Sequence, residues 1–327
     1  MAKIDIIATI ANVFSGDALY AVVRNAQVLG VNYFRFNLCK YYTTSDIKIR
    51  ATEILEMQKR YSVKVMIDVP FPYLKPRIFL RELDVAHTPS LNAHDLVTIS
   101  TTPGSQIFTD CEQMLDLSVD ERVFYDDGVD IWTVIEVGED YVVFKSEYGC
   151  KLYDSKSINF GRLIRSDQMQ QHIDIINYVC PNSVALSFVS SAGDVLAFSD
   201  GLDRKIEVIS KIETAIAVDN IDEIASCSSL MAGRGDLMLY ANYRHLYNYQ
   251  NKIIEAANKF DRNVYVATGI LPSLYLRNIP TQAELIDISK LIECNPTGIV
   301  LNTGVVPHKL KLAMDIIDTI KELKYKS

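Results

Sequence analysis

Eight apolar runs rich in β-branched residues alternate along the chain with segments whose apolar residues recur every three or four positions. The runs span residues 4–10, 31–38, 63–69, 183–189, 206–212, 229–232, 263–267 and 298–301. The segments expected to be helices span 18–28, 45–61, 167–179, 195–202, 217–225, 244–260, 282–292 and 307–323. Strands that alternate with helices pair in parallel through right-handed crossovers. The pattern therefore predicts an α/β fold of the (β/α)8 type, a TIM barrel.

One interval breaks the alternation, from residue 73 to residue 165. It contains short alternating runs at 96–100, 131–135 and 141–144, with turn signals at Pro103-Gly104, Asp127-Gly128 and Gly138-Glu139-Asp140. Such turns are typical of β-hairpins. We expect residues 1–72 and 166–327 to form the barrel and residues 73–165 to form a small β domain inserted after its third strand. A chain of 327 residues has room for both, since a barrel alone takes about 250 residues.

Composition excludes several classes of protein. The net charge of −8 and the lack of a basic cluster denser than residues 321–326 argue against a nucleic-acid partner. Charged residues interrupt the N-terminal segment and no apolar run reaches membrane-spanning length, so we expect a cytoplasmic protein without a signal peptide or a membrane partner. The six cysteines include no Cys-x-x-Cys pair, which makes a zinc site or a disulfide framework unexpected.

The densest chemistry lies between residues 206 and 236. Side chains two apart on a strand share a face, so Lys211 and Glu213 should point together into the barrel mouth. Ile209 should share that side, and Ile212 should lie outside. The carboxyl ends of barrel strands form the face on which barrel enzymes carry their active sites. An ammonium and a carboxylate are therefore expected in one crevice.

Asp236 follows the next apolar run, which leaves two interpretations of these acids open. If Asp236 ends that strand, its carboxylate can meet that of Glu213 around Mg²⁺ or Mn²⁺, hard cations that prefer oxygen ligands. Alternatively, Lys211 and Glu213 form a buried ion pair and Asp236 caps the helix that follows Gly235.

Several ordered motifs, together with the barrel and its insertion, resemble the pyruvate kinase family over essentially the whole chain. The barrel motifs that match the family or are similar to it are Arg35-Phe36-Asn37, Ser210-Lys211-Ile212-Glu213, Ala232-Gly233-Arg234-Gly235-Asp236-Leu237, Ala267-Thr268 and Pro280-Thr281-Gln282-Ala283-Glu284. Those in the insertion are Tyr125-Asp126-Asp127-Gly128, Gly149-Cys150-Lys151-Leu152 and Lys156-Ser157-Ile158-Asn159. The resemblance implies that the insertion is a lid domain and that the family's C-terminal regulatory domain is missing.

The resemblance also implies a site for phosphoenolpyruvate or its enolate. Glu213 and Asp236 would be the ligands of the divalent metal, and Lys211 would stabilise charge on the phosphoryl and enolate oxygens. Thr268 would lie on the route that delivers a proton to the substrate, and Arg35 would hold the phosphate bidentately. The implied catalytic residues are Lys211, Thr268 and Arg35, and the implied substrate-binding residues are Arg35, Lys75, Gly235, Asp236 and Thr268. The implied nucleotide-binding residues are Asn37, Asp127 and Lys156.

Departures from the family pattern change two of these expectations. The positions that match the family's monovalent-cation site are Asn37, Cys39, Asp68 and Val69. Two oxygen ligands are missing there, so we expect that a monovalent cation is not required. Lys75 replaces a phosphate-binding arginine and loses its bidentate fork. Changes at residues 9–12, 68–72, 267–271 and 301–305 put the use of ADP in question, so we expect a diverged nucleotide site.

Three functional classes compete. The first is a pyruvate kinase-like phosphotransferase, which the lid favours. The second is a metal-dependent lyase or aldolase that works through a pyruvate enolate, and the third is a non-catalytic ligand-binding derivative. The expected partner is a small molecule, phosphoenolpyruvate or pyruvate, with a nucleotide left open. Tyrosines 240, 243, 247 and 249 either line a substrate mouth or form a helix packing stripe or a subunit contact, which leaves a homo-oligomer open.

Overall fold

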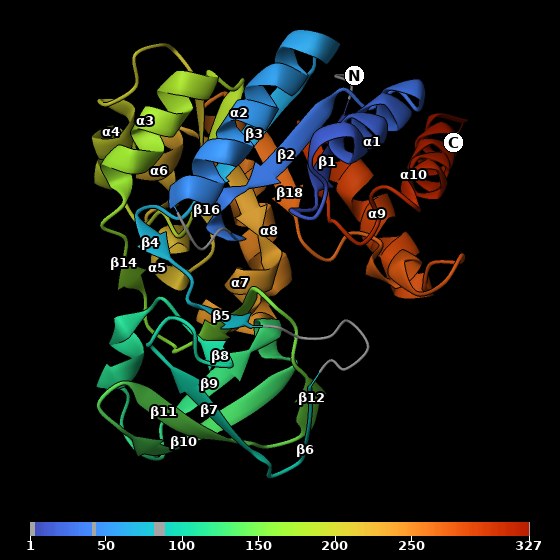
Figure 1. Cartoon of the computed structure of the whole chain (residues 1–327). Coiled ribbons are helices and arrows are strands. Elements are labelled where there is room, and N and C mark those ends of the chain that lie inside the picture. Colours follow the sequence, from blue (N-terminus) through green and yellow to red (C-terminus); the bar gives the residue numbers. More distant parts are fainter. Residues whose placement is uncertain (1–3, 41–43, 82–88, 327) are drawn as a thin grey trace. The chain divides into compact units, whose positions relative to one another are not determined.

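The computed structural model describes residues 4–40, 44–81 and 89–326 (Figure 1). The chain divides into two compact units. Residues 1–38, 43–72 and 167–327 form the larger unit, and residues 73–166 form the smaller unit together with a short segment that begins at Cys39. Among the described residues, no helix is both long and apolar enough to cross a membrane.

Within the described residues, the larger unit contains a closed barrel of parallel strands. Its strands are β1 (Asp5–Ile10), β2 (Tyr33–Asn37), β3 (Lys64–Val69), β15 (Ser183–Leu186), β16 (Glu207–Ile212), β17 (Ser229–Gly233), β18 (Val264–Ala267) and β19 (Gly298–Leu301). They follow one another around the ring in chain order, and β19 pairs in parallel with β1 to close it. The predicted (β/α)8 barrel is confirmed. β15 ends at Leu186, three residues before the predicted end of that run.

Helices follow the strands and lie outside them (Figure 1). They are α1 (Gly16–Val28), α2 (Thr44–Tyr61), α3 (Met169–Val179), α4 (Ala192–Ser199), α5 (Ala215–Asp219), α6 (Ile221–Cys227), α7 (Arg234–Tyr240), α8 (Leu246–Lys259), α9 (Gln282–Cys294) and α10 (Leu310–Lys326). The single helix predicted over 217–225 is wrong, because Asn220 separates α5 from α6 and donates a hydrogen bond from Nδ2 to the Ser190 carbonyl. The helix expected after Gly235 is present as α7, which begins at Arg234 and spans seven residues, too few for a periodic apolar pattern to outline it.

Apolar side chains fill the interior of this barrel, as is usual for the fold. The buried cluster consists of Ile7, Tyr33, Met66, Ala185, Ile209, Met231, Tyr265, Ala267 and Val300. At the amino-terminal ends of the strands, Glu207 accepts hydrogen bonds from Ser229 Oγ, Asn263 Nδ2 and Tyr265 OH. Ile209 belongs to this buried cluster, so it lies inside the barrel, as the strand periodicity predicted.

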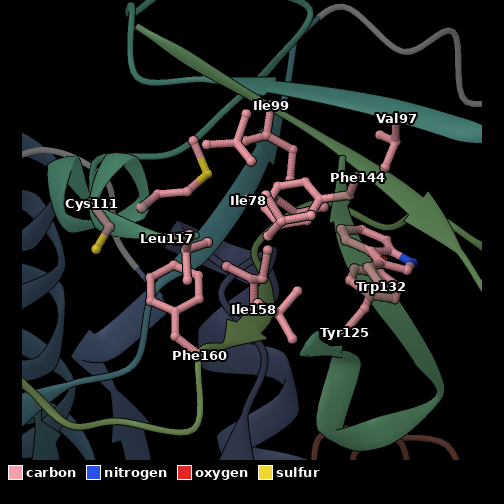
Figure 2. Packing of buried hydrophobic residues seen from close by; sticks show 14 of the residues in the cluster. Ile78, Val97, Ile99, Cys111, Leu117, Tyr125, Trp132, Phe144, Ile158 and Phe160 are labelled. Atoms are coloured by element: carbon pink, nitrogen blue, oxygen red, sulfur yellow. The ribbon is translucent and has the colours of Figure 1, made fainter. Parts of the chain in front are cut away.

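The smaller unit also contains a closed barrel, built mainly from antiparallel pairs of short strands. Its strands are β5 (Arg77–Leu80), β7 (Leu96–Ser100), β8 (Ile107–Phe108), β9 (Arg122–Tyr125), β10 (Asp130–Val137), β11 (Tyr141–Ser146) and β13 (Lys156–Asn159). Two-stranded sheets pair β6 (Ser90–Asn92) with β12 (Gly149–Lys151) and β4 (Tyr73–Leu74) with β14 (Ile164–Arg165). Figure 2 shows its core, where the rings of Trp132 and Tyr125 stack with centroids 4.6 Å apart.

Two of the three predicted hairpins in this unit are confirmed. Residues 138–140 join β10 to β11, and the Asp127-Gly128 turn joins β9 to β10. Asp126, Asp127 and Gly128 all have positive φ values, of 44°, 59° and 89°. The hairpin predicted at Pro103-Gly104 is wrong, because the strands that flank it, β7 and β8, pair in parallel. The chain that leaves β7 is instead bound to the β10–β11 turn, since Thr101 N donates to the Asp140 carbonyl.

Candidate active site

A cluster of charged side chains lies at the carboxyl ends of β2, β3 and β16, and we call Arg35, Asp68, Lys211 and Glu213 the mouth cluster. Arg35 donates from Nε (3.1 Å) and Nη2 (2.5 Å) to Asp68 Oδ2. Lys211 Nζ lies 3.2 Å from Asp68 Oδ1 and 3.2 Å from Glu213 Oε1. It also donates to Ser187 Oγ at 3.0 Å. One ammonium group therefore joins two acids that come from different strands.

Asp68 is the centre of this cluster and is fully buried. Burial alone would raise the pKa of its carboxyl group, but the charges of Lys211 and Arg35 outweigh burial and hold that pKa below its usual range. Asp68 is thus an ionised group between two cations. From the sequence, Asp68 was expected only at the position of the family's monovalent-cation site. Its place at the end of the strand beside Arg35 was the available signal, since β2 and β3 are neighbours in the ring.

Arg35 uses the edge of its guanidinium that joins Nε to Nη2 on Asp68, while Nη1 donates to Thr9 Oγ1 at 3.2 Å. The bidentate geometry that the sequence analysis assigned to a phosphate is therefore directed at a carboxylate of the protein. Asn37 ends β2 and pairs in register with Asp68, and Val69 ends β3. Asn37 and Val69, two positions that match the family's monovalent-cation site, therefore lie beside Asp68, which already pairs with Arg35 and Lys211.

Glu213 lies just beyond β16 with 2% of its surface exposed. It accepts a hydrogen bond from Phe188 N at 2.8 Å. Burial raises the pKa of Glu213 to about 7, with Asp236 and Asp68 adding to the rise and Lys211 opposing it. Gly233 makes room for this side chain, because a Cβ there would lie 2.6 Å from Glu213 Cγ. The mouth therefore contains a carboxyl group whose negative charge is only partly compensated.

The structure supports part of the second interpretation of these acids, the ion pair with a helix cap. Lys211 and Glu213 do form a buried ion pair. The capping residue of α7 is Gly233, however, and Asp236 lies in the first turn of that helix, so the prediction that Asp236 is the cap is wrong. The negative charge of Asp236 acts on Glu213, as the pKa of Glu213 shows.

The donor chemistry of Glu213 and Asp236 fits a hard divalent cation. Within the described ranges, no group of three or more His, Cys, Asp or Glu side chains is arranged to hold a metal. Two carboxylates are nevertheless sufficient for Mg²⁺, which proteins often bind through one or two carboxylates with water and substrate phosphate in the other positions. A bound cation would also relieve the repulsion between the two acids. The residues present therefore fit such an ion.

Thr268 follows β18 with a φ of 70°, which is unusual for a β-branched residue. Its side chain lies against the first turn of α7, where a Cβ on Gly235 would be 2.8 Å from Thr268 Cγ2. Arg234 donates from Nε and Nη2 to the Thr268 carbonyl at 2.9 and 2.7 Å. This contact was not predicted, because the motif around Arg234 does not indicate which segment its side chain reaches.

In the smaller unit, two lysines pair with the acids of the turn at residues 126–128. Lys75 Nζ lies 2.5 Å from Asp127 Oδ1, and Lys156 Nζ lies 2.8 Å from both Asp126 oxygens. Burial would raise the pKa of Asp127, but Lys75 outweighs burial and lowers it. The structure thus brings Lys75, Asp127 and Lys156 to one turn of this unit.

Comparison with known proteins identifies the family. A model described as "Pyruvate kinase, barrel domain" matches residues 1–302. The pyruvate kinase of Thermotoga maritima is 26% identical over 324 residues, 94% of this chain and 68% of that protein. That of Encephalitozoon cuniculi is 30% identical over 182 residues, 54% of this chain and 42% of that protein. The chain spans about half the length of many of the relatives it matches. This chain belongs to the pyruvate kinase family.

Proposed function

We propose that the chain is a pyruvate kinase-like phosphotransferase that acts on phosphoenolpyruvate, or on the enolate of pyruvate, with a divalent metal. The observation that carries this proposal is the position of Lys211, whose ammonium group lies 3.2 Å from each of two buried acids at the barrel mouth. Phosphoryl transfer depends mainly on positioning and electrostatic stabilisation rather than on covalent chemistry by the protein. A fixed cation beside a partly compensated carboxylate meets both needs.

The candidate site residues of the larger unit then take the following roles. Glu213 and Asp236 hold Mg²⁺ or Mn²⁺, which when bound neutralises developing charge on the substrate oxygens. Lys211 is held in advance by Asp68 and Ser187, so it stabilises a phosphoryl or enolate oxygen with little reorganisation. Thr268 serves proton delivery to the methylene carbon.

Two further residues serve substrate binding. Gly235 presents a backbone N–H to the substrate carboxylate from the first turn of α7, where N–H groups have no partner within the helix. Arg35 adds positive charge near the phosphate while its Nε and Nη2 groups hold Asp68.

The nucleotide and cation sites are proposed to be diverged. Lys75 is proposed to bind the substrate phosphate, and the residues proposed to contact a nucleotide are Asp127 and Lys156 in the smaller unit and Asn37 in the larger one. Lys75 and Lys156 already pair with Asp127 and Asp126, so a phosphate group has to compete with these acids. We further infer a cytoplasmic protein, with a homo-oligomer left open.

We expect no requirement for a monovalent cation. Arg35 and Lys211 already supply the positive charge around Asp68, and Cys39 and Val69 replace oxygen ligands. Exchanging K⁺ for a large organic cation at constant ionic strength should leave turnover unchanged. A steep dependence on K⁺ would contradict this expectation.

The function is tested by phosphorus NMR of the protein with phosphoenolpyruvate, Mg²⁺ and a panel of nucleotide and non-nucleotide acceptors. We expect a new phosphoryl product with one acceptor, and its absence with Glu213→Gln. Release of inorganic phosphate in every sample would indicate hydrolysis. No reaction with any acceptor, together with carbon–carbon cleavage or condensation of pyruvate-containing substrates, would favour the lyase or aldolase class. Silence in all assays would favour a non-catalytic ligand-binding protein.

A further inference from the structure

The backbone after β18 adopts a conformation that the local sequence does not favour. Thr268 and Gly269 have φ values of 70° and 72°. Glycine tolerates this region freely, whereas a β-branched residue is strained there. Such strain persists only where the surrounding structure holds the residue in place. Thr268 therefore needs an external support.

Arg234 forms hydrogen bonds that can hold Thr268 in this conformation. Its guanidinium donates twice to the Thr268 carbonyl, and Nη1 and Nη2 also lie 2.7 and 2.9 Å from the two oxygens of Asp287 in α9. Gln250 of α8 accepts a further bond from Nη1 at 3.3 Å. Arg234 is only 9% exposed, and a paired arginine–carboxylate fork fixes orientation as well as charge. The guanidinium is thus bound from three sides.

The first turn of α7 connects this support to the rest of the site. Arg234 holds the Thr268 carbonyl, Gly235 receives the Thr268 side chain, and Asp236 is the proposed metal ligand. These three residues are consecutive. A displacement of Thr268 relative to α7 would therefore also be a displacement relative to the metal site.

We propose that Arg234 and Asp287 form a positioning pair that fixes Thr268 for proton delivery. This inference rests on the proposed function. In that reaction the bond between phosphorus and the enol oxygen breaks, the phosphoryl group passes to the acceptor, and the enolate carbon forms a C–H bond with a proton that Thr268 relays from solvent. Arg234 and Asp287 touch neither substrate nor metal in this scheme. Their contribution is the orientation of the Thr268 peptide.

The test compares Asp287→Asn and Arg234→Lys with the wild type. Asp287→Asn removes the charged partner at constant size, and Arg234→Lys keeps the charge but loses the planar fork. Glu293→Gln is the matched control, because Glu293 lies on the same helix in an exposed ion pair with Lys290. Three quantities are measured: exchange of the pyruvate methyl protons for deuterium by proton NMR, Mn²⁺ affinity by calorimetry, and the Thr268 backbone conformation by crystallography.

We expect both variants to lose at least about tenfold in proton exchange, since small misplacements of a reacting group cost this much or more. Mn²⁺ affinity should stay within about twofold of the wild type, and Thr268 should leave the left-handed region. Asp287→Glu should recover part of the exchange rate. The control should match the wild type throughout.

Two results would overturn the positioning pair. The first is an unchanged Thr268 conformation in both variants, and the second is a parallel loss of Mn²⁺ affinity and exchange, which would show a general structural role. A wild type that catalyses neither exchange nor phosphoryl transfer would instead count against the proposed function. In that case the Thr268 conformation alone decides whether the pair positions this residue.

Discussion

Two buried glutamates of the larger unit have opposite surroundings. Glu284, at the start of α9, accepts hydrogen bonds from the N–H and hydroxyl groups of both Ser273 and Thr281. Burial would raise its pKa, but these four donors outweigh burial and lower the pKa to about 2. Glu213 in the mouth cluster accepts one backbone N–H bond and pairs with Lys211, and its pKa is raised to about 7.

Glu284 is a carboxylate whose hydrogen bonds complete the fold, whereas Glu213 is the carboxylate that the proposed function assigns to a metal. Glu284 is satisfied by the protein itself, in a capping box that begins the helix. The mouth instead gathers three acids, Asp68, Glu213 and Asp236, around the two cations Arg35 and Lys211. Asp236 and Asp68 add to the rise in the pKa of Glu213, and a divalent ion held by Glu213 and Asp236, as proposed above, would relieve that repulsion.

The largest expected effect is on stability and comes from Asp68→Ala. This change leaves Arg35 and Lys211 without their shared, fully buried partner, so we expect a loss of about 3–5 kcal/mol in the free energy of unfolding. Urea unfolding measures it. Asp222→Ala is the control, because Asp222 pairs with Lys259 on the exposed surface. A loss no greater than that of the control would show that the mouth cluster does not depend on Asp68.

The next effect is on the reaction and comes from Lys211→Met. We expect a rate loss of roughly 10² to 10³, as for removal of one electrostatic stabiliser, measured at saturating metal. The variant should also be less stable than the wild type, because Asp68 and Glu213 lose the ammonium that they share. The assay is therefore run well below its melting temperature. Full turnover would assign Lys211 a purely structural role, and Lys259→Met serves as the surface control.

Metal addition should distinguish the two glutamates directly. Mn²⁺ at about one hundred times its dissociation constant should stabilise the wild type by about 2.7 kcal/mol, and a chelator should remove that gain. Glu213→Gln should lose most of this response, whereas Glu284→Gln should retain it. Thermal unfolding with and without Mn²⁺ gives the values. An equal response in wild type and Glu213→Gln would place the cation elsewhere.

The smallest effect concerns Glu284→Gln and depends on pH. At pH 7 we expect a loss of about 1–3 kcal/mol, because the amide cannot accept all four hydrogen bonds. A lowered pKa means that the unfolded chain takes up a proton before the folded one, so the carboxylate contributes fully above its ordinary pKa. The difference between wild type and variant should therefore shrink as pH falls from about 5 toward 2. A constant difference across that range would refute the capping account.

The strands of the larger unit could be predicted because each one is a run of apolar, β-branched residues long enough to cross the barrel. The direction of Lys211 and Glu213 followed from the two-residue period of a strand. The contact between Arg35 and Asp68 joins residues 33 positions apart, and that between Arg234 and Asp287 joins residues 53 apart. The predicted order of the barrel strands makes β2 and β3 neighbours, so the first contact could have been foreseen, whereas the second depends on how the helices α7 and α9 pack, which no local pattern reports.

The smaller unit shows the same limit. The hairpin β10–β11 was predicted because a turn connects two adjacent strands. β5, β8 and β13 are only two to four residues long and pair with distant partners, so their own sequences contain little alternation. Asp126 and Asp127 both have positive φ values, and they pair with Lys156 and Lys75, which lie far from them along the chain.

The packed interior of the parallel barrel also closes the route through the barrel. Tyr33, Met66, Met231 and Tyr265 fill the space beneath the mouth cluster, and Glu207 ties Tyr265 to the far end of the strands. The barrel is therefore open at the mouth cluster and filled by side chains below it, so its described part contains no continuous channel. Under the proposed function, substrate, metal and product therefore enter and leave by the same opening at the carboxyl ends of the strands.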